Sequence, residues 1–207
     1  MKISASYLGI KDNIKDNIKK LDNSNIDFIH MDVMDGIYVP NKTLDDNILY
    51  NYLSDTKKLK DIHLMVNDVI KYVDLYMKFN PYYITFHIEG NNILENINYI
   101  KSKHVKVGLA IKPNTNIEEL YPYLDKIDLV LIMSVTPGFS GQKFMINSID
   151  KVNKLIQYRN NNHLSFLISI DGGINNETIR LVDTDIVVVG SFITNSDDYN
   201  KQIEYLK

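Results

Sequence analysis

The sequence predicts an α/β fold, a closed (β/α)₈ TIM barrel, and three observations lead to this prediction. Short apolar runs alternate with longer amphipathic stretches, a pattern typical of buried parallel strands covered by helices. Eight such units follow one another along the chain. The length of 207 residues lies at the compact end of this barrel's range, which is roughly 200 to 400 residues. An open doubly wound sheet is the alternative, but eight strands with eight helices favour closure.

Each strand is expected where an apolar run is bounded by polar or turn-forming residues. In chain order the expected strands are Ile3–Leu8, Phe28–Val33, Asp61–Met65, Tyr82–His87, Val105–Ile111, Leu129–Ser134, Phe166–Asp171 and Ile186–Gly190. The helices expected between and after them are Asn13–Leu21, Asp45–Ser54, Asp68–Phe79, Ile93–Lys103, Ile117–Leu124, Ser148–Asn160, Asn176–Leu181 and Asp197–Leu206. Several begin at residues that favour helix N-termini, such as Asp68, Asn92 and Asn176. No linker or low-complexity segment interrupts the pattern, so we expect a single domain over residues 1–207.

Composition excludes several classes of function. Hydrophobic residues make up 44% of the chain, enough for one sizeable core. The net charge of −3 and the lack of a basic cluster argue against a nucleic-acid partner. There is no cysteine, which excludes thiolate metal sites and cysteine nucleophiles and fits a cytoplasmic protein. We expect neither a targeting segment nor a membrane partner, because no stretch is apolar over a sufficient length.

Polar side chains collect at the ends of three expected strands. His30 and Asp32 are two positions apart on one strand and therefore project to the same side. His63 and Asp171 end two other strands, and active sites of these barrels lie at the C-terminal strand ends. Two imidazoles and two carboxylates suit one divalent ion. We expect Zn²⁺, with Fe²⁺, Mn²⁺ or Co²⁺ as alternatives.

Each of these four residues also has a structural interpretation. A single buried histidine is usually a hydrogen-bonded core residue, and an aspartate near a strand end often forms a turn. Four such groups meeting at one barrel mouth would repel one another or stay unsatisfied without an ion, which favours the metal site. His87 and Glu89 end another strand, and we interpret them as supporting polar residues.

Glycines are concentrated after the last three expected strands. Glycine allows backbone N–H groups to approach an anion, and these loops are the usual phosphate site of the barrel. We therefore predict a phosphate cradle, although each loop alone could be an ordinary turn. Its residues are Gly138, Phe139, Ser140, Gly141, Gly172, Gly173, Gly190 and Ser191. No Walker-type Gly-Lys-Ser/Thr sequence is present, which argues against a nucleoside triphosphate.

Three methionines lie at or near expected strand ends: Met34, Met65 and Met133. A methionine in such a position usually fills gaps in the core. Here the three side chains could instead wall the reacting centre and keep water out. The sequence leaves both interpretations open.

The motifs resemble those of the ribulose-phosphate 3-epimerase family along nearly the whole chain. The matching segments are Ile3-Ser4-Ala5-Ser6, His30-Met31-Asp32-Val33-Met34-Asp35-Gly36, Val39-Pro40-Asn41, His63-Leu64-Met65-Val66, Thr85-Phe86-His87, Val107-Gly108-Leu109-Ala110-Ile111-Lys112-Pro113, Met133-Ser134-Val135-Thr136-Pro137-Gly138-Phe139, Asp171-Gly172-Gly173 and Gly190-Ser191. The resemblance implies a barrel of the ribulose-phosphate-binding type and a homo-oligomer. The chain departs from the family's usual sequence at Ser140, where glycine is usual.

The resemblance further implies residue roles. Metal ligation would fall to His30, Asp32, His63 and Asp171, and acid/base catalysis to Asp32 and Asp171. Ser6 and His63 would contact the substrate, and the phosphate would bind at Gly173, Gly190 and Ser191. The implied reaction converts D-ribulose 5-phosphate to D-xylulose 5-phosphate in the pentose phosphate pathway.

Epimerisation beside a ketone removes a proton from one face of the carbon and returns one to the other face. Two carboxylates on opposite sides of a planar enediolate suit this task. Three other functions stay open. The Met-Lys-Ile-Ser start is similar to that of allulose-6-phosphate 3-epimerases, which act on a six-carbon ketose phosphate. The ligand set also suits a metal-dependent hydrolase, and the barrel could be a non-catalytic sugar-phosphate sensor.

Overall fold

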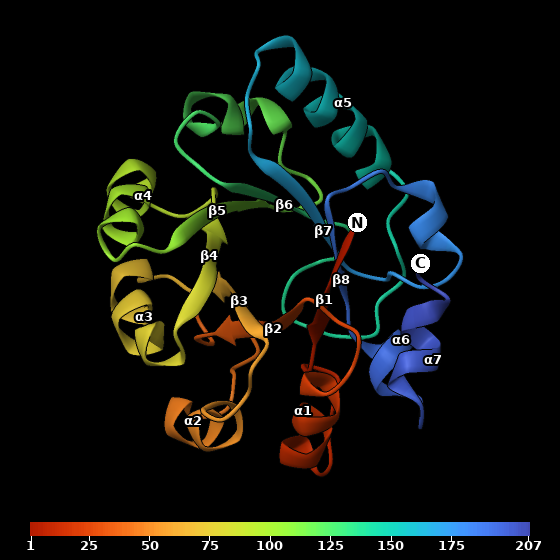
Figure 1. Ribbon diagram of the computed structural model, residues 1–207. Helices are drawn as coiled ribbons and strands as arrows, with labels where there is room; N and C mark the ends of the chain where they lie inside the picture. Colours follow the sequence, from red (N-terminus) through yellow and green to blue (C-terminus); the bar gives the residue numbers. More distant parts are fainter.

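The computed structural model describes residues 1–207 and has eight parallel strands closed into a barrel (Figure 1). The strands are β1 (Lys2–Ser6), β2 (Phe28–Met34), β3 (Leu59–Met65), β4 (Pro81–His87), β5 (Lys106–Ile111), β6 (Leu129–Met133), β7 (Leu167–Asp171) and β8 (Ile186–Val189). They pair in chain order, and β1 closes the sheet against β8, with Ala5 opposite Val189. The predicted (β/α)₈ barrel is therefore confirmed.

Helices form a ring outside the strands (Figure 1). They are α1 (Ile14–Asp22), α2 (Asp46–Leu53), α3 (Val69–Tyr76), α4 (Ile93–Ser102), α5 (Ser148–Asn161), α6 (Ser191–Thr194) and α7 (Tyr199–Glu204), with 3₁₀ turns η1 (Met77–Phe79), η2 (Ile117–Tyr123) and η3 (Thr178–Leu181). The side chains of Asp45, Asp68 and Asp198 accept backbone N–H groups at the starts of α2, α3 and α7. These caps satisfy donors that the first helical turn leaves free.

Three expected helices differ from the prediction, and one of them, Asn176–Leu181, is only the 3₁₀ turn η3. The segment from Ile117 forms the 3₁₀ turn η2 because Pro122 lies inside it, and proline lacks the N–H that an α-helix needs. The final helix starts at Tyr199 rather than Asp197, since Asp198 is its cap. The short helix α6, directly after β8, was not expected from the sequence.

Successive side chains of each strand point alternately to the outer and the inner face of the barrel sheet, so two separate apolar regions form. On β2, the side chains of Ile29, Met31 and Val33 belong to the cluster of 47 buried residues that packs the barrel against the helices. Phe28 lies on the opposite face of β2, and its side chain points into the barrel interior. It packs with Tyr83, Leu129 and Ile186 of β4, β6 and β8, the layer of alternate strands that is typical of this barrel. Above this apolar layer the interior becomes polar.

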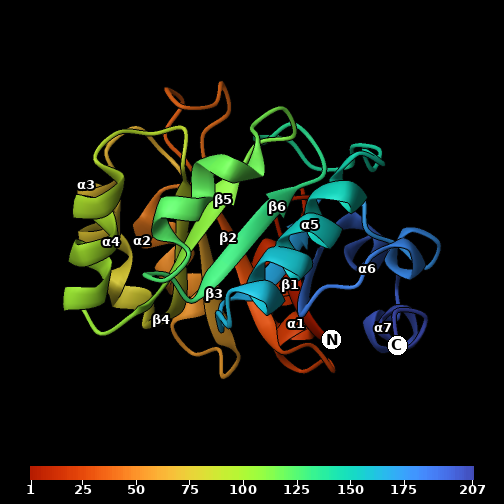
Figure 2. The same cartoon turned by 90° about the horizontal axis from the view of Figure 1, so that it is seen from above.

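The polar side of the interior faces the C-terminal ends of the strands. Figure 2 shows the loops after β2 and β6 rising at one end of the barrel, with the N-terminus near the opposite end. The strand ends on the loop side hold the polar groups that the sequence singled out.

No helix combines the length and the apolar character needed to cross a bilayer.

Candidate active site

Four polar side chains predicted from the sequence meet at the C-terminal end of the barrel. One ligand atom from each of His30, Asp32, His63 and Asp171 lies within 4.8 Å of the others. Asp32 Oδ1 lies 3.5 Å from His30 Nε2 and 3.3 Å from His63 Nδ1. Asp171 Oδ2 lies 3.8 Å from each of these two nitrogens. The parallel strands β2, β3 and β7 thus bring the side chains together although they are far apart in the sequence.

The two imidazole nitrogens that face this cluster have no hydrogen-bond partner. His30 Nε2 and His63 Nδ1 are both buried and unpaired. A buried polar atom without a partner costs free energy, and a bound cation would satisfy both lone pairs at once. The donor set of two nitrogens and two carboxylates suits a divalent transition metal such as Zn²⁺. The residues present therefore fit a metal ion.

The far side of the His30 ring is held by a carboxylate that sequence reasoning missed. His30 Nδ1 lies 2.8 Å from Asp61 Oδ2, which also accepts a hydrogen bond from Ser4 Oγ at 2.7 Å. Asp61 is only 3% exposed. Its position two residues before His63 on β3 was the available signal, because both side chains must point to the same face.

The far side of the His63 ring contacts a second histidine. His63 Nε2 lies 2.9 Å from His87 Nε2, and His87 Nδ1 lies 3.1 Å from Glu89 Oε2. His87 ends β4, and Glu89 lies in the turn that follows it. The interpretation of His87 and Glu89 as supporting polar residues agrees with this placement.

The charges within the cluster shift the pKa values of its members in opposite directions. Burial opposes ionisation of Asp32, but the positive charge of the nearby His30 outweighs it and holds the pKa far below the usual range. Burial raises the pKa of Asp171 to about 6, and the charge of Asp32 adds to this shift. Burial lowers the pKa of His30, yet Asp61 and Asp32 outweigh that effect and raise it well above its usual value. The two carboxylates therefore differ in proton affinity.

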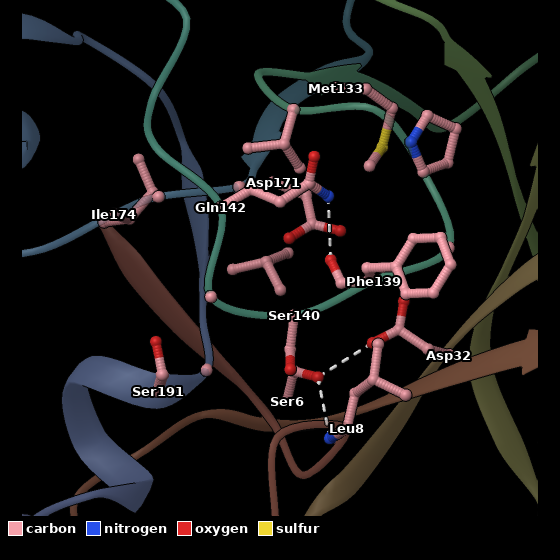
Figure 3. A pocket seen from close by; sticks show the side chains of 18 of the residues that line it. Ser6, Leu8, Asp32, Met133, Phe139, Ser140, Gln142, Asp171, Ile174 and Ser191 are labelled. Atoms are coloured by element: carbon pink, nitrogen blue, oxygen red, sulfur yellow. Dashed lines mark hydrogen bonds between the residues drawn. The ribbon is translucent and has the colours of Figure 1, made fainter. Parts of the chain in front are cut away.

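The predicted glycine loops line one pocket above the cluster. Its walls include Ser6, Asp32 and Asp171 together with Gly138, Phe139, Ser140, Gly141, Gly172, Gly173, Gly190 and Ser191. Figure 3 shows Asp32 and Asp171 entering this pocket from different strands, with Ser6 bonded to Asp32. Ser6 Oγ donates to Asp32 Oδ2 at 2.8 Å. The three loops after β6, β7 and β8 are thus brought together with the two carboxylates.

Two glycines after β7 cannot be replaced without strain. Gly172 and Gly173 both have positive φ, at 123° and 65°. A Cβ atom on Gly172 would lie 2.4 Å from Val135 Cγ2, and one on Gly173 would lie 2.4 Å from the backbone nitrogen of Phe144. The backbone here passes too close to its neighbours for any side chain.

The three methionines are placed differently. Met65 and Met133 line the pocket. Met34 is not among the pocket-lining residues and packs with Val39 and Met65 instead. Of the two interpretations for Met34, the packing contacts fit the gap-filling one.

Comparisons with known proteins show the family of this chain. The family model described as the ribulose-phosphate 3 epimerase family matches residues 2–194. The chain belongs to the ribulose-phosphate 3-epimerase family. A ribulose-phosphate 3-epimerase of Buchnera aphidicola is 39% identical over 209 residues, covering 97% of this chain and 90% of the relative. One from Helicobacter pylori is 38% identical over 188 residues, covering 89% and 87%.

Solved structures outside the ribulose-phosphate 3-epimerases share the fold. The 3-hexulose-6-phosphate synthase of Salmonella typhimurium superposes with a TM-score of 0.75 at 16% identity, covering 100% of this chain and 96% of that one. At this identity the likeness concerns the barrel alone. Family membership, by contrast, agrees with the resemblance that the sequence motifs predicted.

Proposed function

We propose that this chain interconverts D-ribulose 5-phosphate and D-xylulose 5-phosphate by epimerisation at C3, the reaction for which its family is named. The observation that carries the proposal is the Asp32–Asp171 pair. The two carboxylates come from β2 and β7 and converge on the same cluster. Their pKa values are shifted in opposite directions, which suits one group to accept a proton while the other donates one.

The proton transfers follow from this difference. In one direction ionised Asp32 removes the C3 proton, and protonated Asp171 delivers a proton to the opposite face of the planar enediolate. The reverse reaction exchanges the two roles. The hydrogen bond from Ser6 holds Asp32 Oδ2 in place for this step. Neither carboxylate needs to cross the site during the reaction, since each serves its own face of the substrate.

A divalent ion held by His30, Asp32, His63 and Asp171 would supply Lewis-acid stabilisation of the negative charge that develops on the substrate oxygens. Asp61 would support this role by fixing the orientation of the His30 ring. Met65 and Met133 present weakly polar side chains to the pocket, which favours exclusion of water from the reacting carbon.

The substrate phosphate would bind at the glycine loops. The backbone N–H groups of Gly173, Gly190 and Ser191 donate to no other protein atom and belong to residues that line the pocket. Free N–H groups of this kind are good partners for a phosphate oxygen. The substrate class is therefore a phosphorylated ketose, and the place of this reaction in the pentose phosphate pathway is part of the same proposal.

Proton exchange at C3 tests the proposal directly. The protein, loaded with Zn²⁺, is incubated with D-ribulose 5-phosphate in heavy water, and deuterium at C3 is measured by NMR. We expect incorporation with the wild-type protein. Asp32→Asn and Asp171→Asn should both lose conversion to D-xylulose 5-phosphate, and only the variant that keeps the carboxylate on the reacting face should still exchange the C3 proton. Metal analysis of each variant separates loss of the base from loss of the ion. Exchange retained in both metal-loaded variants would contradict the two-base assignment.

A parallel assay tests the substrate. Allulose 6-phosphate is supplied beside D-ribulose 5-phosphate, and kcat/KM is compared. We expect the five-carbon sugar to be preferred. A preference for the six-carbon sugar would assign the chain to the other epimerase activity. Tight binding of both sugars without any exchange in metal-loaded protein would identify a sensor.

A further inference from the structure

A chain of hydrogen-bonded side chains leads from the metal-ligand cluster to the rim of the barrel. It runs from His63 through His87 to Glu89, with nitrogen–nitrogen and nitrogen–oxygen distances of 2.9 and 3.1 Å. We call these three residues the histidine chain. Both rings are almost fully buried, at 0% and 3% exposure. Water therefore has little access to the ring nitrogens, and the protein itself determines where their hydrogens lie.

The position of one hydrogen decides whether His63 can bind a cation. A neutral imidazole carries a hydrogen on one ring nitrogen only, and a metal needs the lone pair of the other. His63 Nδ1 faces the cluster, so the hydrogen must be on Nε2. His63 Nε2 can donate that hydrogen only to His87 Nε2. His87 must then carry its own hydrogen on Nδ1 and donate it to Glu89.

Glu89 is built to accept hydrogen bonds on both oxygens. Oε1 accepts the backbone N–H of Lys112 at 2.7 Å and also the Thr115 hydroxyl. Oε2 accepts the Tyr38 hydroxyl at 3.1 Å, beside His87 Nδ1. The donors come from the loops after β2 and β5. The carboxylate is thus fixed in place, with one oxygen aimed at the His87 ring.

We propose that Glu89 is a positioning residue, which acts through His87 to keep the hydrogen of His63 on Nε2 and so leaves Nδ1 free to bind the metal ion. The opposite arrangement would direct a hydrogen from His63 Nδ1 toward Asp32 Oδ1, 3.3 Å away. The geometry there is not that of a hydrogen bond, and Nδ1 is unpaired. The two shorter contacts of the histidine chain therefore select the tautomer that can bind the ion.

The substitution Glu89→Gln should reverse this arrangement while keeping the shape of the side chain. The Lys112 N–H is a fixed donor, so it holds the amide oxygen on its own side. The amide NH₂ group then faces His87 Nδ1 and donates to it. His87 must carry its hydrogen on Nε2 and donate to His63 Nε2, which moves the His63 hydrogen to Nδ1. The ligand nitrogen is then blocked.

Tyr38→Phe is the matched control. It also removes one hydrogen bond to Glu89, but it leaves the carboxylate as an acceptor for His87. The aromatic ring, which lies 5.1 Å from the His87 ring, stays in place. A loss of affinity caused merely by a loosened network would appear in both variants, whereas a tautomer effect would appear only in Glu89→Gln.

The test measures Zn²⁺ affinity by chelator competition and the His63 tautomer by ¹⁵N NMR of the metal-free protein. We expect Zn²⁺ affinity to fall about 10- to 100-fold in Glu89→Gln, the usual effect of losing an outer partner of a ligand. Tyr38→Phe should bind Zn²⁺ like wild type. The NMR spectrum should show the hydrogen on Nε2 in wild type and in Tyr38→Phe, and on Nδ1 in Glu89→Gln.

Several results would overturn the inference. A hydrogen on His63 Nδ1 in the wild-type protein would do so without any variant. Equal Zn²⁺ affinity of wild type and Glu89→Gln would do so while leaving the proposed metal site intact. The inference also rests on the proposed metal site, so a wild-type protein that does not bind Zn²⁺ would overturn both. The epimerase activity itself is tested separately by the C3 exchange.

Discussion

Asp61 Oδ2 lies 2.8 Å from Nδ1 of His30 and holds that ring on the side away from the pocket. A carboxylate in this position orients the imidazole and directs Nε2 toward the ligand cluster. Asp61 thus does for His30 what the histidine chain does for His63. The site contains two histidines that we propose as metal ligands. Asp61 lies directly behind one, and Glu89 lies behind the other through His87.

We expect Asp61→Asn to weaken Zn²⁺ binding about 10- to 100-fold. The amide group can donate to His30 Nδ1, which would place the ring hydrogen on Nε2, where the ion must bind. The loss of the Asp61 charge would also lower the pKa of His30, which offsets part of this effect because fewer protons compete with the ion. Ser4→Ala is the control, because it removes the other hydrogen bond of Asp61 and keeps the carboxylate. Chelator competition checks both variants, and an unchanged affinity in Asp61→Asn would show that Asp61 does not orient His30.

Zn²⁺ affinity should fall as the pH falls, and more steeply below about pH 6. In the metal-free protein the raised pKa of His30 keeps that ring protonated at neutral pH, so binding must release this proton. The pKa of Asp171 is raised to about 6, so below this pH a second proton must leave. Calorimetry in buffers of different ionisation enthalpy measures the protons released. Asp171→Asn should remove the second release, and pH-independent affinity between about pH 5 and 7 would contradict the assignment.

Two glycine substitutions separate backbone strain from steric clash. Gly141→Ala should cost about 1–2 kcal/mol in the free energy of unfolding, because φ is 75° but nothing lies near the new Cβ. Gly173→Ala should cost more, on the order of 3–5 kcal/mol, because the Cβ also meets the Phe144 backbone. Urea denaturation measures both changes. Equal losses would show that the loop after β7 can move away from Phe144.

The close contact between Gly108 of β5 and Thr85 of β4 predicts that a second substitution can restore stability lost through the first. A Cβ on Gly108 would lie 2.3 Å from Thr85 Oγ1 and 3.1 Å from Thr85 Cγ2. Gly108→Ala should therefore destabilise the protein by about 1–3 kcal/mol through overpacking. Adding Thr85→Ala removes these two atoms and leaves only Thr85 Cβ, at 3.1 Å. It should restore much of the loss, since the buried Thr85 hydroxyl has no hydrogen-bond partner. A double-mutant cycle measures the coupling. Additive losses would show that the clash is relieved elsewhere.

The alternation of strands and helices and the residues at the strand ends could be predicted from the amino-acid sequence alone. Both patterns are local. A buried strand is a short apolar run, and side chains two positions apart share a face, so His30 and Asp32 could be paired without coordinates. The glycine loops were predictable for the same reason, because their position follows from the ends of β6, β7 and β8.

The side chains behind the proposed ligands could be identified only from the three-dimensional structure. Tyr38 and Glu89 are 51 positions apart and contact each other at 3.1 Å because the barrel closes. The direction in which each imidazole turns depends on Asp61 and His87, which pack against the rings from neighbouring strands. Whether two side chains form a hydrogen bond depends on differences of a few tenths of an ångström in the distance between donor and acceptor. Sequence spacing defines a shared face, whereas the curvature of the closed sheet sets those distances.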